Sequence, residues 1–455
     1  MLSAGPALSQ GLPFQLFTNE LIWYSGEFRT ERVGGIRSMN DGNHYTSQES
    51  SKWGTTIVKY AYKTGEAVDT LATSMSIFGD TEQLFDGYEF SSDERALLIT
   101  TETEGIYRHS FAAHFYVHNL SKNSTQPLTD FDLGKQRLAA FSPNANQVAF
   151  MRDNNVFIAD IANGTENQVT TDGRVNEVIN GATDWVYEEE FGDDNGLFWS
   201  PDGAFLAFYR FDESAVREFS MPVYGQLYPE PVVFKYPKAG EDNAQVSVLV
   251  HEVAGNRNIP VLLPKSEYIP RIKWGADNKQ LVLMTMNRHQ NLLSLMMANC
   301  EKIGFNGLVT GKIWSEQALT YIDLNDDIRF LQDGKSFVMA SERDGYNHLY
   351  LFSTDKDQET VQLTSGEWDV LEVYGVDEKR KQVYFTCSVQ GATQTHIGRV
   401  SFDGKMELVD EVLGTHSASY SNSFDYSIHV YNNANTPPVY TLRDRQGKVV
   451  RSLKD

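Results

Sequence analysis

Three consecutive carboxylates, Glu188, Glu189 and Glu190, lie within the largely aromatic and apolar run 184–191 (DWVYEEEF). Carboxylates in such surroundings repel one another and persist where a cation or hydrogen-bond donors offset the cost of burying charge. An ammonium group offers three N–H donors, and the N-terminus of a peptide is such a group. Taken alone, the run favours a solvated acidic turn in a Glu-rich chain, so the ammonium site depends on the rest of the sequence.

Arg108 is the second residue with a chemistry of its own, because it lies in the aromatic segment 106–110 (IYRHS). A guanidinium fork there could hold a carbonyl or a carboxylate of a ligand. The alternative is an ion pair at the rim of the fold, with one of the glutamates as a candidate partner. Both interpretations stay open, since one arginine can pair with a glutamate and still contact a ligand.

The sequence contains no recognisable catalytic or metal-binding motif. There is no Gly-x-Ser-x-Gly elbow, no His-Glu-x-x-His, no Cys-x-x-Cys, no Walker loop and no dinucleotide-binding glycine cluster. His109, His114 and His118 lie close together, but no carboxylate or cysteine stands at ligand spacing, so polar histidines on a strand face are the better explanation. We therefore expect no catalytic residue, metal or cofactor in this chain.

Composition narrows the classes of partner. The 455 residues carry a formal net charge of −22, which disfavours nucleic acid and anionic lipid and favours cationic or N-terminally charged partners. The two cysteines, Cys300 and Cys387, lie in apolar, strand-like surroundings and are expected to be buried thiols. No apolar run approaches the ~20 residues needed to cross a bilayer.

A repeat of turns predicts the fold. Apolar or aromatic residues followed by Ser, Asp, Pro, Gly or Asn begin near positions 39, 90, 141, 199, 274, 330, 374 and 424, and strand-like patterns follow them. Eight repeats with a period near fifty residues indicate an all-β, eight-bladed β-propeller. The two longest intervals, 141–199 and 199–274, predict insertions, and the first of them contains the Glu run as a short helical insertion.

This pattern resembles one known family. Residues 184–190 (DWVYEEE) are similar to the double-glutamate motif of the dipeptidyl peptidase IV family, in the prolyl oligopeptidase clan, and 107–110 (YRHS) resemble its substrate-binding arginine segment. Further similarities lie at 35–42 (GIRSMNDG), 236–240 (YPKAG), 341–348 (SERDGYNH) and 363–368 (LTSGEW). The resemblance spans essentially the whole chain in the family's order, and the family's propeller also has eight blades.

The resemblance implies roles for three residues. In the family, the second and third glutamates bind the free N-terminus of the substrate, which assigns Glu189 and Glu190. The arginine, here Arg108, contacts the carbonyl side of the second substrate residue. The family releases dipeptides, preferentially after proline or alanine, through a Ser-Asp-His α/β-hydrolase domain that follows the propeller. This sequence ends at about that point, and it departs from the family at 192–196 (GDDNG), where a more apolar loop is expected.

We therefore expect a leader and N-terminal strap over residues 1–30, the propeller over 31–455, and no catalytic α/β-hydrolase domain. The apolar segment 14–24 (FQLFTNELIWY) packs near the hydrolase in the family, and without that partner it would lie exposed and favour self-association, a homodimer included. Residues 1–11 contain small residues like those at a signal cleavage site but no basic region or apolar core. By resemblance to exported bacterial members, a periplasmic or extracellular location is expected.

Two hypotheses follow. The leading one is a substrate-gating propeller that binds peptide N-termini for a dipeptidyl peptidase IV-like serine exopeptidase releasing X-Pro and X-Ala dipeptides, with this chain inert by itself. The alternative is a non-enzymatic propeller that acts as a protein-interaction module, since propellers serve many functions. A Gly-x-Ser-x-Gly followed by Asp and His downstream in the coding sequence would favour the first hypothesis, and a stop codon after position 455 the second.

Overall fold

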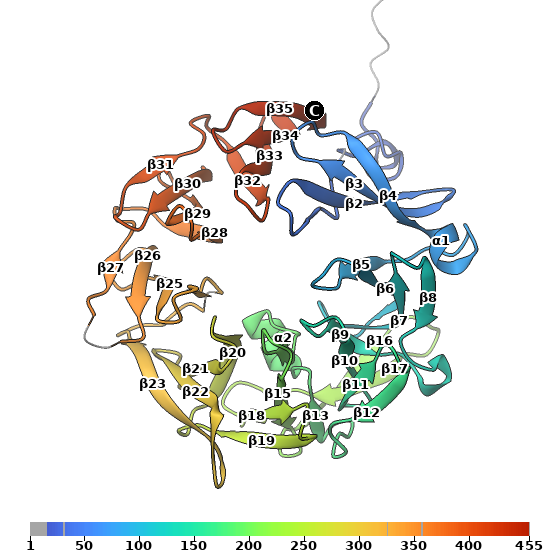
Figure 1. Cartoon of the computed structure of the whole chain (residues 1–455), viewed down its shortest axis with the longest axis vertical. Coiled ribbons are helices and arrows are strands. Elements are labelled where there is room, and N and C mark those ends of the chain that lie inside the picture. The colour runs from blue at the N-terminus through green and yellow to red at the C-terminus, as the bar shows by residue number, and fades with distance from the viewer. Residues whose placement is uncertain (1–15, 31, 325, 356–357, 455) are drawn as a thin grey trace, which may run out of the picture.

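The computed structural model describes residues 16–30, 32–324, 326–355 and 358–454, and its strands form a ring of eight radial sheets (Figure 1). Six blades are separate four-stranded sheets, and the fourth and fifth are joined in one nine-stranded sheet. The predicted all-β, eight-bladed propeller is thus confirmed. The predicted leader at 1–11 lies outside the described residues, and the domain boundary near residue 30 stays a prediction.

Each blade is an antiparallel meander built from consecutive strands. Blades 1 to 4 contain β1 (Arg37–Ser38), β2 (His44–Ser51), β3 (Gly54–Ala61) and β4 (Ala67–Thr73); β5 (Gly87–Phe90), β6 (Ala96–Gly105), β7 (Phe111–Asn119) and β8 (Ser124–Pro127); β9 (Arg137–Phe141), β10 (Gln147–Arg152), β11 (Asn155–Asp160) and β12 (Thr165–Gln168); and β13 (Val178–Asn180), β14 (Leu197–Trp199), β15 (Phe205–Asp212), β18 (Gln245–Glu252) and β19 (Arg257–Leu262). Blades 5 to 8 contain β20 (Tyr268–Trp274), β21 (Gln280–Met286), β22 (Leu292–Gly304) and β23 (Gly307–Gln317); β24 (Arg329–Phe330), β25 (Ser336–Ser341), β26 (His348–Ser353) and β27 (Val361–Gln362); β28 (Val370–Asp377), β29 (Gln382–Cys387), β30 (His396–Ser401) and β31 (Met406–Leu408); and β32 (Thr415–Tyr420), β33 (Tyr426–Asn433), β34 (Thr436–Asp444) and β35 (Val449–Lys454).

The predicted turns connect the first and second strands of the blades. In blade 4 the Ser200 hydroxyl donates to Asp202 at 2.7 Å and accepts from the backbone N–H of Phe205 at 2.9 Å, while Gly203 takes the left-handed conformation at φ 72°. Ser142 accepts from Gln147 N–H in the same way at 3.0 Å. The prediction at 374 is too early, because β28 continues through Tyr374 to Asp377 and its turn follows.

Two insertions leave the repeat in blade 4, as the long intervals predict. The short helix α2 (Trp185–Phe191) lies between β13 and β14, and Figure 1 shows it inside the ring. The hairpin of β16 (Glu218–Val223) and β17 (Glu230–Lys235) lies between β15 and β18 and forms a two-stranded sheet of its own. β19 of blade 4 also pairs in parallel with β23 of blade 5. This pairing joins blade 5 to the blade that carries α2.

The hydrophobic cores lie between neighbouring blades. Each sheet has a neighbouring sheet on either side, so both of its faces are covered. Leu98 and Phe115 of blade 2, for example, pack with Val148 and Phe150 of blade 3. The ring closes without a shared strand: Tyr45 and Tyr62 of blade 1 pack with Ile428 and Leu442 of blade 8. Two smaller helices, α1 (Ser74–Phe78) and the 3₁₀ turn η2 (Phe131–Leu133), lie at blade connections.

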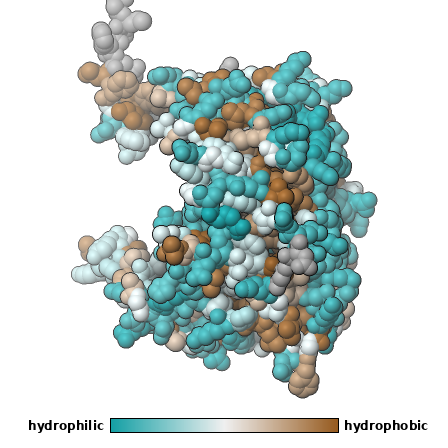
Figure 2. All heavy atoms as spheres, turned by 90° about the vertical axis from the view of Figure 1, so that its left-hand side faces the viewer, coloured by the Kyte–Doolittle hydropathy of each residue, from teal (hydrophilic) through white to brown (hydrophobic). Residues whose placement is uncertain are grey.

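The strap before the propeller is exposed, as expected for its described part. It contains the short helix η1 (Glu20–Tyr24), and the side chains of Leu16, Phe17, Trp23 and Tyr24 face solvent. Figure 2 shows hydrophobic side chains gathered on a projection at this end of an otherwise largely hydrophilic face. Among the described residues, no helix has the length and apolar character required to cross a membrane.

Candidate functional site

The Glu run forms α2 because both of its ends are capped. The Asp184 carboxylate accepts from the backbone N–H of Tyr187 at 3.0 Å, which satisfies one of the free donors of the first turn. Gly192 ends the helix in the left-handed conformation at φ 61°, where a glycine carries no steric penalty. Val186, Tyr187 and Phe191 are buried, so the helix turns its apolar side to the ring and leaves the second and third glutamates on the other side.

Blade 5 holds α2 in place. The Tyr187 hydroxyl accepts from the backbone N–H of Ile269 at 2.7 Å, and the Arg271 guanidinium donates to the Phe191 carbonyl at 2.7 Å. Arg271 also forms a two-point ion pair with Asp326, which lies before blade 6. Its second anion, Asp193, is 3.9 Å away, so the acidic loop that departs from the family pattern is held against the same cation.

Replacing Arg271 by Met should therefore loosen α2. The substitution keeps the length of the apolar stem but removes the donors to Phe191 and Asp326, and it leaves Asp193 without its cation. Because Asp326 is half exposed and can be hydrated, we expect a loss of about 2–3 kcal/mol in unfolding free energy. Urea unfolding measures it, with Arg95→Met, an exposed arginine 3.9 Å from Asp93, as control. Equal stability of the two variants would contradict this account.

The three glutamates have three different surroundings. Glu188 is fully buried, and one of its oxygens accepts from the backbone N–H groups of His109 and Ser110 at 2.7 and 2.8 Å. Glu189 pairs with Arg108. Glu190 is exposed and borders a cavity. Glu189 and Glu190 lie in the last turn of this two-turn helix, where neighbouring positions point ~100° apart.

Arg108 is brought to the glutamates by the turn 106–110 between β6 and β7. Its Nε donates to Glu189 Oε2 at 2.9 Å, and its side chain remains 71% exposed while that of Glu189 is 16% exposed. The ion pair considered from the sequence is thus present, and it leaves most of the guanidinium accessible. The structure thus pairs Arg108 with Glu189, which lies 81 positions further along the chain, while Glu190 borders a cavity that neither of them lines.

The surroundings of α2 are anionic and poorly hydrated. Burial raises the pKa of Asp184 to about 6, and burial together with the nearby Asp184 raises the pKa of Glu213 to about 7. Burial also raises the pKa of Asp193 to about 6 against the opposing effect of Arg271. These three carboxyl groups are therefore harder to ionise than exposed ones.

A cavity of about 400 Å³ opens beside Glu190. Trp185 and Tyr236 form one aromatic wall, with ring centroids 4.5 Å apart, and Tyr268 and Tyr321 also line the space. The base of the β16–β17 hairpin supplies Tyr236, so the second insertion of blade 4 completes the wall that the first begins. Besides these aromatic sides, the cavity is lined by two exposed carboxylates, Glu190 and Glu241, and by two exposed cationic side chains, Lys238 and Arg288.

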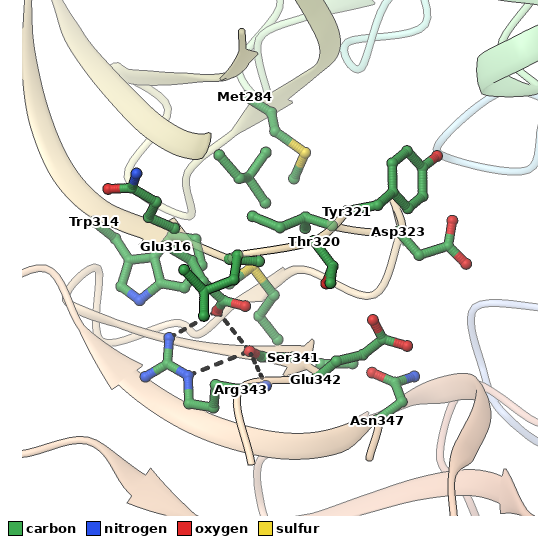
Figure 3. Close-up of a pocket in the computed structure, with 17 residues that line it drawn as sticks. Met284, Trp314, Glu316, Thr320, Tyr321, Asp323, Ser341, Glu342, Arg343 and Asn347 are labelled. Atoms are coloured by element: carbon green, nitrogen blue, oxygen red, sulfur yellow. Dashed lines mark hydrogen bonds and ion pairs between the residues drawn. The ribbon is translucent and has the colours of Figure 1, made fainter. Parts of the chain in front are cut away.

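A second cavity, of about 390 Å³, lies between blades 5 and 6 and shares Tyr321 with the first (Figure 3). On one side Arg343 donates to Glu316 at 3.0 Å and to Ser341 at 3.2 Å, and the Ser341 hydroxyl donates to Glu316 at 2.6 Å. Figure 3 shows Asp323 and Glu342 on the side of Tyr321.

A separate group of buried polar side chains lies between blades 7 and 8. Asp410 Oδ1 is 2.9 Å from His396 Nδ1 and 3.1 Å from His416 Nε2, and His416 Nδ1 is 2.9 Å from His429 Nε2. Donor atoms of His396, Asp410 and His416 lie within 4.8 Å of one another, yet neutral histidines satisfy these contacts as hydrogen bonds. The histidines noted from the sequence are elsewhere: His114 and His118 both lie on β7.

Sequence reasoning missed the groups that hold the site rather than form it. Arg271 carried no motif, Tyr187 lies within the Glu motif but was given no role, and the buried histidine group joins residues from three strands and a loop. Position at the start of a strand is the only signal that His396 gave in the sequence. Cys300 and Cys387 are buried as expected, and burial raises the pKa of their thiols to about 12 and about 11.

The chain is similar in sequence to known proteins. Residues 91–438 match the family model described as the dipeptidyl peptidase IV N-terminal region. The chain is 31% identical over 379 residues to dipeptidyl peptidase 4 of Trichophyton rubrum, covering 78% of this chain and 48% of that protein. It is 30% identical over 441 residues to dipeptidyl peptidase 4 of Arthroderma otae, covering 92% and 54%.

The fold is similar to the crystal structure of Porphyromonas gingivalis dipeptidyl peptidase 4, with a TM-score of 0.88 and 39% identity over 95% of this chain and 61% of that one. The chain thus spans about half the length of the curated relatives that it matches.

Proposed function

Because the chain belongs to the dipeptidyl peptidase IV family, we propose that it binds the free N-terminus of peptides at Glu189 and Glu190 and gates their access to a serine exopeptidase domain. The observation that supports the proposal is the ion pair of Arg108 with Glu189, next in sequence to Glu190, which borders the first cavity. The substrates proposed are peptides that release X-Pro or X-Ala dipeptides. Glu190 and the free oxygen of Glu189 would hold the ammonium, and the exposed edge of Arg108 would hold a backbone carbonyl.

Such a site counts residues from the N-terminus. An internal segment of a peptide has no ammonium, so it would leave the carboxylates unpaired in a poorly hydrated place. The arginine adds the second reference point, because the first peptide carbonyl stands at a fixed distance from the ammonium. The pair of contacts thus supports a site that measures a short length of chain, independent of the residues further along.

N-acetylation of the peptide tests this function directly. The acetyl group removes the positive charge and the donors while it keeps the sequence, so the chain should bind a Gly-Pro-containing peptide with a free amine about 10–100-fold more tightly than its acetylated form. Isothermal titration calorimetry measures both affinities. Equal affinities would contradict the ammonium site.

The pH dependence of binding gives an independent test. A peptide α-amino group loses its proton at a pKa of ~7.7–8.0, so the ammonium form that the carboxylates bind becomes scarce above that range. We expect affinity to fall about tenfold for each pH unit above ~8, and the acetylated peptide to show no such fall. A constant affinity between pH 7 and 10 would argue against a charged ligand.

We further propose that this chain is catalytically inert without a hydrolase partner, since no nucleophile motif occurs in its sequence. A Gly-Pro chromogenic substrate should therefore show no turnover at enzyme-like rates. A periplasmic or extracellular location and a homodimer are part of the same proposal. The exposed apolar strap and the exposed hydrophobic side chains of the β16–β17 hairpin support self-association, which sedimentation can measure. The second candidate, a non-enzymatic interaction module, would give a chain that binds acetylated and free peptides alike.

A further inference from the structure

Glu188 connects blade 4 with blade 2, although it is the glutamate to which no role has been given. It lies on α2 of blade 4, it accepts both backbone N–H groups that follow Arg108 in the β6–β7 turn of blade 2, and it is fully inaccessible to solvent. Its second oxygen is also buried and has no hydrogen-bond partner among the described residues. A carboxylate in this state cannot reach a ligand, so it must serve the protein itself.

Arg137 of blade 3 is the complementary group. It begins β9, the strand of blade 3 that Figure 1 shows beside α2. Its Nε and Nη2 atoms are buried and have no hydrogen-bond partner among the described residues. The next residue of β9, Leu138, packs against the buried cluster that contains Tyr187 and Phe191 of α2. Burial lowers the pKa of Arg137, and the Glu188 carboxylate is the largest opposing influence, followed by Tyr107 and Asp194. A buried cation and a buried anion, each with unsatisfied atoms, thus lie within electrostatic reach of each other.

We propose that Glu188 and Arg137 form an internal charge pair that positions the peptide site. Glu188 is in this view a positioning residue: its first oxygen ties the Arg108 turn to α2, and its charge is balanced from behind by Arg137. The inference rests on the proposed function for its consequence, since the turn and the helix carry Arg108 and Glu189. In this proposal Glu188 stabilises the protein internally, and Glu189 and Glu190 bind the ligand.

The physical reason for a charged residue at this position is the strength of its two hydrogen bonds. A carboxylate accepts backbone N–H groups about twice as strongly as a neutral amide does, but it costs free energy to bury without a cation. Arg137 lowers that cost, and its Nε and Nη2 atoms have no hydrogen-bond partner among the described residues. Removal of either charge should therefore leave the other one buried and unbalanced, whereas removal of both should be tolerated.

A double-mutant cycle on the whole chain tests the pair. Glu188→Gln keeps an acceptor for the two N–H groups but loses the charge, Arg137→Met removes the cation, and the third variant combines them. The readouts are the exchange rates of the His109 and Ser110 amide hydrogens and the affinity for a free-amine Gly-Pro peptide. We expect each single variant to exchange these amides at least tenfold faster and to bind about tenfold more weakly, and the double variant to return to within about threefold of the parent.

Two further variants separate charge balance from other causes. Glu188→Met also removes the acceptor, so Arg137→Met should not rescue it. The exposed pair Arg174 and Glu177, 3.5 Å apart, provides the control cycle of Arg174→Met with Glu177→Gln, in which no coupling is expected. Independent, multiplicative losses in the Glu188 and Arg137 variants would overturn the proposal, as would unchanged exchange at His109 and Ser110.

The exchange readout keeps this inference distinct from the proposed function. If the parent chain binds acetylated and free peptides equally, the proposed function fails, and the amide exchange cycle still measures whether Glu188 and Arg137 are coupled. If the parent prefers the free amine but the cycle is additive, the function stands and the positioning role of Glu188 is wrong.

Discussion

Changing Glu189 and Glu190 together to Gln is expected to abolish measurable binding of free-amine dipeptides. An ammonium about 4 Å from a carboxylate gains on the order of 4 kcal/mol at an effective dielectric constant near 20, and desolvation returns part of it. Two such contacts at ~1.5–3 kcal/mol net correspond to a loss of more than 100-fold in affinity. Calorimetry on the parent and the variant measures this loss.

The two single variants should differ in kind. Glu190 has an exposed carboxylate at the cavity, so Glu190→Gln removes a ligand contact and little else. Glu189 also holds Arg108 at 2.9 Å, so Glu189→Gln frees the guanidinium and should weaken the grip on the peptide carbonyl as well. We therefore expect Glu189→Gln to reduce binding of both free and acetylated peptides, and Glu190→Gln to reduce only the former.

A control variant with the same change in net charge is needed for this experiment. Glu82 and Glu359 are exposed and lie outside the site, so Glu82→Gln with Glu359→Gln removes the same net charge from the surface. That variant should bind like the parent, because long-range charge is screened within ~10 Å at 0.1 M salt. If it lost as much affinity as the site variant, the effect would be one of overall charge and the ammonium site would be wrong.

The fold could be predicted from the sequence because its signals are local. A turn such as 199–203 (WSPDG) depends on its own side chains, as Ser200 and Asp202 show, and strand patterns are read over a few residues. Eight local signals were enough to count eight blades. Where the local signal was weak, at Tyr374, the predicted turn fell inside β28.

The residues of the candidate site could also be predicted from the sequence, but the residues that hold them in place could not. Arg108, Glu189 and Glu190 were found through their motifs, and the structure pairs Arg108 with Glu189. Arg271, which fixes the end of α2 from 80 residues away, and Arg137, which lies behind Glu188, have no motif of their own. Their importance arises from contacts between blades, which depend on how the ring closes and not on neighbouring residues in the sequence.

The buried histidines between blades 7 and 8 should make the protein acid-sensitive. Burial lowers the pKa of His429 to about 3, with Arg443 and His416 acting in the same direction. Burial also lowers the pKa of His416, against the opposing effects of Val412 and Asp410. An unfolded histidine takes up its proton near pH ~6.5. Below that pH the unfolded chain binds more protons than the folded one, so the stabilisation is complete above pH ~6.5 and is lost as the pH falls toward 3.

The size of this effect follows from the shift. Each unit of difference in pKa corresponds to ~1.4 kcal/mol, so His429 alone accounts for a loss on the order of 4–5 kcal/mol between pH 6.5 and 3. Asp184, Asp193 and Glu213 act in the opposite sense, because burial raises their pKa values and their stabilisation is lost as the pH rises through about 6 to 7. The total pH profile is therefore a sum, and only a difference between variants isolates the histidine.

His429→Gln provides that difference. The glutamine amide can still donate to His416 Nδ1, as the ring Nε2–H does at 2.9 Å, but it does not titrate. Relative to the parent, the variant should lose stability at pH 7 from imperfect packing and then lose less on acidification, so that the two unfolding curves converge or cross between pH 6 and 4. His289→Gln, at an exposed position, should run parallel to the parent throughout. If the stability of His429→Gln instead fell with pH in parallel with that of the parent, protonation of His429 would not be a cause of the acid sensitivity.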